Sequence, residues 1–216
     1  EPHPFAAATG DLDGDRSLDI AVACYGASKV LVLFGNGKGA FPRRAAYAVR
    51  WPTFVISVDI DGDAHLDLAA AGYGARAVTL LRNQGDGSFE AKGALDVGAP
   101  PYTLLAPDLN GDGRPDIVTA NTMAGTLCAF LNSGGGSFSN RYRYPVGMDP
   151  RFAVAGDIDR DGDVDVISAN HSSLDLTVLL NEHRIIQHGG ATVMVAGVTD
   201  PSSHEMVPAH VSDPAA

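Results

Sequence analysis

Short apolar runs alternate with polar turns along this chain, and the pattern predicts strands. In the first unit the runs are FAAATG, LDIAVACY, KVLVLF and AAYAV, with glycine-containing turns between them. Runs of this length, rich in small and β-branched residues and bounded by turn residues, are typical of strands. We therefore expect four short antiparallel strands in this unit.

The unit recurs, because four Asp-rich loops begin 48 or 49 residues apart. All four match the pattern D-x-[DN]-x-D-x-x-x-D. They read DLDGDRSLD from Asp11, DIDGDAHLD from Asp59, DLNGDGRPD from Asp108 and DIDRDGDVD from Asp157. Four strands in each repeat of this length are the content of one propeller blade.

The predicted fold class is therefore all-β, a β-propeller of four-stranded antiparallel blades with four visible repeats. ATVMVAGV, at residues 191–198, predicts the last strand of the fourth blade. We expect propeller repeats over residues 1–198 and a C-terminal tail, or the start of a truncated segment, over 199–216. The blades are expected at about residues 4–50, 51–98, 99–147 and 148–198.

Charge and composition exclude several classes of protein. The formal net charge is −11 and the basic residues do not cluster, so we expect no nucleic-acid partner. No apolar run approaches the roughly 20 residues that a membrane-spanning helix needs, so we expect no transmembrane segment.

Because the sequence begins at Glu1 without a leader, we expect a processed mature chain or a fragment. Cys24 and Cys128 occupy different positions in their repeats, which predicts two buried thiols.

The Asp-rich loops are the strongest candidates for chemistry. Ca²⁺ takes six to eight oxygen ligands, and alternating Asp side chains on a tight loop can turn toward one point. Loop positions one, three, five and nine supply the predicted side-chain ligands. Position seven varies in every copy, which fits a ligand that uses only its backbone carbonyl: Ser17, His65, Arg114 and Asp163.

Two simpler interpretations of these loops compete with metal binding. Asp and Gly favour turns in any hairpin, but four copies in register exceed what turn formation needs. An EF-hand needs Glu at loop position 12, where this chain has Val22, Ala70, Thr119 and Ser168. Unit charges about 4 Å apart repel by roughly 4 kcal/mol at an effective dielectric near 20. No basic partner is evident within the loops, so we expect four Ca²⁺ ions, which change the formal charge from −11 to −3.

The loops, their flanking strands and the turns GNGKGAF, GDGSF and GGGSF resemble the FG-GAP or VCBS repeats of integrin α-subunit propellers and many secreted bacterial proteins. The resemblance spans about residues 4–181 and implies a calcium loop between the first two strands of each blade. The side-chain ligands that it implies are Asp11, Asp13, Asp15 and Asp19; Asp59, Asp61, Asp63 and Asp67; Asp108, Asn110, Asp112 and Asp116; and Asp157, Asp159, Asp161 and Asp165. Family propellers usually have seven or eight blades, so the four repeats are either a small complete propeller or part of a larger one.

Antiparallel connectivity predicts that the calcium loops lie on one face and that the other turns lie on the opposite face. Aromatic side chains near a channel mouth can stack on sugars or contact a protein. The candidate ligand face comprises Tyr25, Trp51, Tyr73, Tyr102, Arg151 and His171. A structural interpretation, in which aromatics wedge between adjacent blades, applies to Phe5, Phe54, Tyr102 and Phe152.

The leading functional hypothesis is a calcium-binding module, extracellular, on the cell surface or periplasmic, that mediates adhesion by binding a protein or a glycan. Millimolar extracellular calcium fills even weak sites. We find no catalytic motif and expect no enzyme activity. Two alternatives stay open: the propeller domain of a secreted, lyase-like polysaccharide-degrading enzyme, and a structural spacer of a larger surface protein.

Overall fold

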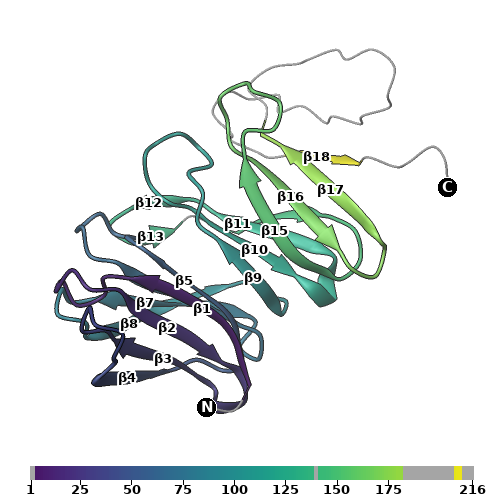
Figure 1. Cartoon of the computed structure of the whole chain (residues 1–216). Coiled ribbons are helices and arrows are strands. Elements are labelled where there is room, and N and C mark those ends of the chain that lie inside the picture. The colour runs from purple at the N-terminus through teal and green to yellow at the C-terminus, as the bar shows by residue number, and fades with distance from the viewer. Residues whose placement is uncertain (1–2, 139–140, 182–206, 211–216) are drawn as a thin grey trace.

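The computed structural model describes residues 3–138, 141–181 and 207–210, and these residues form four four-stranded antiparallel sheets (Figure 1). The first sheet contains β1 (Pro4–Gly10), β2 (Asp19–Cys24), β3 (Lys29–Phe34) and β4 (Arg43–Ala48). The second contains β5 (Pro52–Val58), β6 (Asp67–Gly72), β7 (Ala77–Asn83) and β8 (Phe89–Asp96). The third contains β9 (Pro101–Leu105), β10 (Ile117–Asn121), β11 (Thr126–Phe130) and β14 (Tyr142–Pro145). The fourth contains β15 (Pro150–Gly156), β16 (Asp165–Asn170), β17 (Asp175–Leu180) and β18 (Val207–His210).

Three small elements complete the described fold. The 3₁₀ turns η1 (Tyr25–Ala27) and η2 (Thr122–Ala124) join the second and third strands of the first and third sheets. The strands β12 (Asn132–Gly134) and β13 (Ser137–Phe138) form a hairpin between β11 and β14. Within the described residues, no helix is long and apolar enough to cross a membrane.

The four strands predicted for the first unit are confirmed. The last strand of the fourth sheet, β18, pairs with β17 and lies in the segment that the sequence pattern assigned to a tail. The strand predicted at 191–198 lies outside the described residues. Both cysteines are buried free thiols, as predicted.

The sheets follow one another and enclose an apolar core between each neighbouring pair (Figure 1). The strand β6 contributes to two cores, because successive side chains point to opposite faces of a sheet. Leu68 and Ala70 pack toward the first sheet, whereas Ala69 and Ala71 pack toward the third. This two-sided burial explains why the inner strands are continuous apolar runs of small residues.

The first strands of neighbouring sheets pack together in the order β1, β5, β9 and β15. Their side chains also bond across the sheet boundaries: the Ser57 hydroxyl donates to the Thr9 carbonyl at 3.0 Å, and the Thr103 hydroxyl donates to the Arg151 carbonyl at 3.0 Å. The chain is therefore a row of blade-like sheets whose first strands line one side.

The two ends of the row differ from its middle. In Figure 1 the first and fourth sheets lie at opposite ends. On the fourth sheet Phe152 and Leu176 are 52% and 55% exposed. Cross-strand pairing places Leu176 where the second sheet has Val78, which is fully buried against the third sheet. The fourth sheet therefore exposes the face that the second sheet uses for packing.

Candidate metal centres

Each Asp-rich loop joins the first and second strands of its sheet, and a buried Asp at loop position nine anchors it. Both carboxylate oxygens of this residue accept backbone amides, one within the loop and one after the third strand. In the second loop the Asp67 oxygens accept from Ile60 at 3.0 Å and from Asn83 at 2.7 Å. The same pair of bonds recurs for Asp19, Asp116 and Asp165. The ninth residue therefore ties each loop to the interior of its own sheet.

The residues at positions one, three and five fold the loop around itself. The carboxylate of Asp59 accepts amides from Gly62 at 2.8 Å and from Ala64 at 2.9 Å. Asp61 and Asp63 each accept the amide two residues further along. Equivalent bonds occur in the other three loops. Left-handed backbone at Gly14, Gly62 and Gly113, and at Arg16, Ala64 and Arg160, permits these tight turns.

Three of the loops bring carboxylate oxygens within 4.8 Å of one another. These clusters are Asp11 with Asp13 and Asp15, Asp59 with Asp61 and Asp67, and Asp157 with Asp159 and Asp165. In the third loop the Asn110 amide takes the place of a carboxylate and donates to Asp112 at 3.0 Å. At position seven the backbone N–H donates to the position-five carboxylate in all four loops. This contact does not involve the backbone carbonyl, so the carbonyl ligands predicted at Ser17, His65, Arg114 and Asp163 stay a prediction.

Burial and like charges disfavour ionised carboxylates in these loops. Burial raises the pKa of Asp19, Asp67 and Asp116, although backbone amides partly offset the effect. In the fourth loop burial, followed by the charges of Asp161 and Asp165, raises the pKa of Asp159. A bound cation removes both penalties, because it replaces lost hydration and screens the repulsion.

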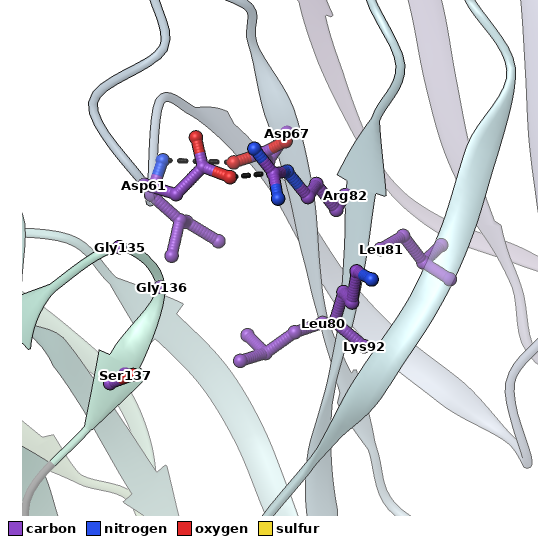
Figure 2. A pocket seen from close by; sticks show the side chains of 10 residues that line it. Asp61, Asp67, Leu80, Leu81, Arg82, Lys92, Gly135, Gly136 and Ser137 are labelled. Carbon is purple, nitrogen blue, oxygen red and sulfur yellow. Dashed lines mark hydrogen bonds and ion pairs between the residues drawn. The ribbon is translucent and has the colours of Figure 1, made fainter.

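Arginine side chains lie among the carboxylates of three loops, which corrects the expectation that the loops lack a basic partner. Arg43 donates to Asp13 at 2.5 Å, and Arg114 donates to Asp112 at 2.5 Å. Arg82 pairs with Asp61 (Figure 2). It also pairs with Asp63 at 3.3 Å. Arg43 and Arg82 lie 30 and 19 residues beyond the carboxylates they meet, so their position could not be seen within the loop sequence.

The first three Asp-rich loops are each also held by the sheet that follows, through an asparagine that links the two sheets. The Asn83 amide donates to the Leu12 carbonyl at 2.8 Å, Asn132 to Ile60 at 2.7 Å, and Asn181 to Leu109 at 2.6 Å. These carbonyls all belong to loop position two of the preceding sheet. We refer to Asn83, Asn132 and Asn181 as the inter-sheet asparagines.

The first sheet has Gly35 where the other sheets have an inter-sheet asparagine. Gly35 donates its amide to Asp19, as Asn83 does to Asp67. A side chain cannot be added here without a shift, because a Cβ atom would lie 2.3 Å from the Leu18 carbonyl oxygen. Asn36, one residue later, instead accepts amides within its own turn.

The glycine turns of the following sheet cover the loops from the other side. A Cβ atom at Gly87 would lie 2.8 Å from the Asp13 Cβ, and one at Gly136 would lie 3.5 Å from the Asp61 Cβ. Both glycines have positive φ, at +77° and +73°. The GDGSF and GGGSF sequences thus combine a left-handed turn with close approach to the Asp-rich loop of the preceding sheet.

A pocket of about 350 Å³ opens between the second loop and the β12–β13 turn (Figure 2). Asp61, Asp67 and Arg82 line one side of it, and Gly136 and Ser137 line the other. Ile60, Leu80 and Leu81 add apolar atoms to the lining, and Lys92 adds a second basic side chain.

The donor set of the loops fits a hard cation. Carboxylate and carbonyl oxygens that converge on one point are the ligands that Ca²⁺ prefers, and guanidinium groups already lie beside the carboxylates of three loops. A family model described as FG-GAP-like repeat matches residues 11–70 and 108–168, which is more than half of the chain. The chain belongs to the FG-GAP-like repeat family. Among curated proteins, no sequence matches it.

Several solved structures have a fold similar to that of this chain. BBS1N in its complex with ARL6DN, soaked with mercury, has a TM-score of 0.58 and 13% identity, with 83% of this chain and 54% of that chain covered. A protein from Lactobacillus plantarum has a TM-score of 0.52 and 11% identity, with 82% of this chain and 54% of that chain covered. A lectin from Agrocybe aegerita that recognises terminal N-acetylglucosamine has a TM-score of 0.49 and 21% identity, with 81% of this chain and 48% of that chain covered. This FG-GAP-like chain therefore spans about half the length of the structures it matches.

The opposite ends of the sheets carry the predicted ligand face, and its aromatic members do come together. The Tyr25 ring stacks on Trp51 at 6.1 Å and meets Tyr73 edge-on at 6.4 Å. Phe5, absent from the prediction, joins the group at 4.9 Å from Tyr25 and 6.4 Å from Tyr102. We refer to Phe5, Tyr25, Trp51, Tyr73 and Tyr102 as the aromatic face.

Trp51 is the most unusual member of the aromatic face. It has a left-handed φ of +50° and is 42% exposed. Gly74 makes room for it, because a Cβ atom there would lie 2.6 Å from the indole ring. His3 and Asp149, which also precede strand-opening prolines, have φ values of +54° and +56°, so this left-handed backbone recurs in the repeat.

Arg151 and His171 form a separate charged group around Asp149. Arg151 pairs with Asp149 at 2.9 Å, and His171 lies 3.3 Å from the same carboxylate. Hydrogen bonds from Arg151 and Ser172 hold the pKa of Asp149 below its usual value against the effect of burial. These two predicted residues therefore meet each other through Asp149.

The four recurring aromatics do not behave alike: Phe54 packs against the core between the second and third sheets, as the wedge interpretation predicts, whereas the others differ from it. A β-bulge follows each strand-opening proline, so Phe5 and Tyr102 occupy one register position whereas Phe54 and Phe152 occupy the next. Phe5 meets Tyr102, and Phe54 meets Phe152 at 6.4 Å, so each pair joins alternate sheets. Phe5 and Phe152 are also about half exposed, which a wedge between blades would not be.

Proposed function

We propose that this FG-GAP-like chain is a calcium-stabilised binding module that works outside the cell or in the periplasm and holds a protein or glycan ligand on its aromatic face. The observation that carries the metal part is the convergence of loop carboxylates within 4.8 Å. Calcium, when bound, supplies a positive charge to which the carboxylates bind at about 2.3–2.6 Å.

The chain's own residues would convert loop order into order between sheets. The ninth carboxylate fixes the loop to its own strand, and the inter-sheet asparagine fixes the same loop to the next sheet. In the second loop both contacts reach Ile60, whose amide donates to Asp67 and whose carbonyl accepts from Asn132. A cation that orders this loop therefore also stiffens the boundary between the second and third sheets.

The aromatic face is the proposed binding surface. Trp51 and Tyr25 present stacked rings, and Arg50 lies 5.1 Å from the Trp51 ring. Flat rings with polar edges contact the apolar faces of sugars or the side chains of a protein partner.

The proposal is tested by glycan-array and protein-array binding with and without calcium, beside a polysaccharide depolymerisation assay. Trp51→Gly is the matched variant, because glycine accepts the left-handed backbone and leaves the fold intact. We expect binding without turnover, and loss of binding in Trp51→Gly at unchanged melting temperature. Turnover of a polysaccharide supports the enzyme alternative, and no binding to either array supports the spacer alternative.

A further inference from the structure

We propose that Arg82 is a built-in counter-ion of the second loop. Its guanidinium pairs with the loop carboxylates when no metal is bound, and calcium must displace the guanidinium in order to bind. This inference rests on the proposed calcium function. It assigns to Arg82, and by the same geometry to Arg43, a role in setting the calcium affinity of individual loops.

The contacts of Arg82 place its charge among the predicted ligands. Its guanidinium pairs with Asp61 at loop position three (Figure 2) and with Asp63 at position five. Asp61 lies within the carboxylate cluster, and its side chain is only 6% exposed. Each carboxylate that binds a guanidinium offers fewer lone pairs to a metal, so calcium and Arg82 compete for the same oxygens.

The arginine is able to leave without disturbing the fold. Its side chain is 41% exposed and lines the pocket of about 350 Å³ beside the loop, which offers it a place to move. The described polar contacts of its guanidinium are those with the two carboxylates. Displacement therefore exchanges one cation for another and leaves the guanidinium in a solvated space.

Arg43 occupies the corresponding place in the first loop but reaches it from a different strand. It begins β4, lies 3.5 Å over the Phe34 ring and pairs with Asp13 at loop position three. Two arginines from different positions in the repeat thus meet equivalent carboxylates. This convergence favours a role in charge balance over an accident of one strand.

The test follows calcium binding to each loop separately by NMR of the ¹⁵N-labelled chain. The amides of Gly62 and Gly14 report the second and first loops, because each donates to the first carboxylate of its own loop at 2.8 Å. In Arg82→Gln we expect the calcium concentration at which the Gly62 signal is half shifted, its midpoint, to fall about fivefold, while the midpoint for Gly14 stays unchanged. Arg43→Gln is expected to give the reciprocal result.

Lys92→Gln is the matched control. Lys92 lines the same pocket but pairs with Glu90 at 3.2 Å, so its loss removes a nearby charge without freeing a loop carboxylate. An unchanged or raised Gly62 midpoint in Arg82→Gln, or an equal shift in Lys92→Gln, overturns the counter-ion role while calcium binding itself stands. If neither Gly62 nor Gly14 responds to calcium up to about 10 mM, the proposed calcium function fails and the counter-ion role fails with it.

Discussion

Replacing Asn132 by Ala should loosen the boundary between the second and third sheets. Asn132 is 1% exposed and its side chain makes three hydrogen bonds: its amide donates to Ile60 at 2.7 Å and to Pro115 at 3.1 Å, and its oxygen accepts from Gly134 at 2.9 Å. Each bond contributes about 1 kcal/mol net, and buried groups left unpaired cost more. We expect a loss of about 3 kcal/mol in the free energy of unfolding.

The matched control is Asn36→Ala, because Asn36 is also an Asn that follows a third strand but lies one position later in its repeat than Asn132 does. Asn36 accepts only the exposed amides of Lys38 and Ala40, so its loss should cost less than about 1 kcal/mol. Urea unfolding of both variants, each in saturating calcium and in EGTA, gives the comparison. Asn132→Ala should also weaken calcium binding by the second loop, because Ile60 belongs to that loop. Equal losses in the two variants would refute the link between sheets.

Three further outcomes follow from the same geometry. Asp67→Asn should reduce the stabilisation that calcium provides, because a neutral amide replaces the carboxylate ligand and its NH₂ group faces a backbone N–H that the carboxylate accepted. Titration calorimetry should show one calcium site fewer or one much weaker site. Burial raises the pKa of Asp67, so between the unfolded-state pKa near 3.9 and the raised folded-state pKa the folded chain binds more protons than the unfolded chain. In EGTA, the contribution of Asp67 to the free energy of unfolding should therefore fall as pH rises through this interval. Urea unfolding of wild type and of Asp67→Asn at several pH values measures this contribution. Leu176→Ser should lower the free energy of unfolding by less than about 0.5 kcal/mol, whereas Val78→Ser at the equivalent buried position should lower it by about 2 kcal/mol or more. Similar losses in the two variants would show that the outer face of the fourth sheet is covered in solution.

The repeat pattern predicted the strands, the loop positions and the grouping of the aromatic face, because these follow from local alternation and from antiparallel connectivity. The prediction failed where a shift of one residue changes which side chain makes a contact. Asn36 matches Asn83 in residue type but lies one position later in its repeat, and the backbone amide that meets the ninth carboxylate belongs to Gly35. The β-bulges hid the true register of Phe5 and Phe54 in the same way.

Contacts between sheets were beyond the reach of local pattern. Asn132 reaches Ile60 across 72 residues, and Asn181 reaches Leu109 across the same separation. Such pairs depend on how the sheets stack, which spacing within one repeat does not encode. The exposed end face of the fourth sheet likewise emerges only when equivalent residues in neighbouring sheets are compared.

The central claim is that the Asp-rich loops bind calcium and that this binding stabilises the fold. Thermal unfolding of the wild-type chain in excess EGTA and at increasing free calcium tests it most directly. The account predicts a melting temperature that rises with free calcium in the logarithmic manner of ligand binding to the folded state, and that falls back when EGTA is added. Superimposable melting curves in EGTA and in millimolar calcium would contradict it.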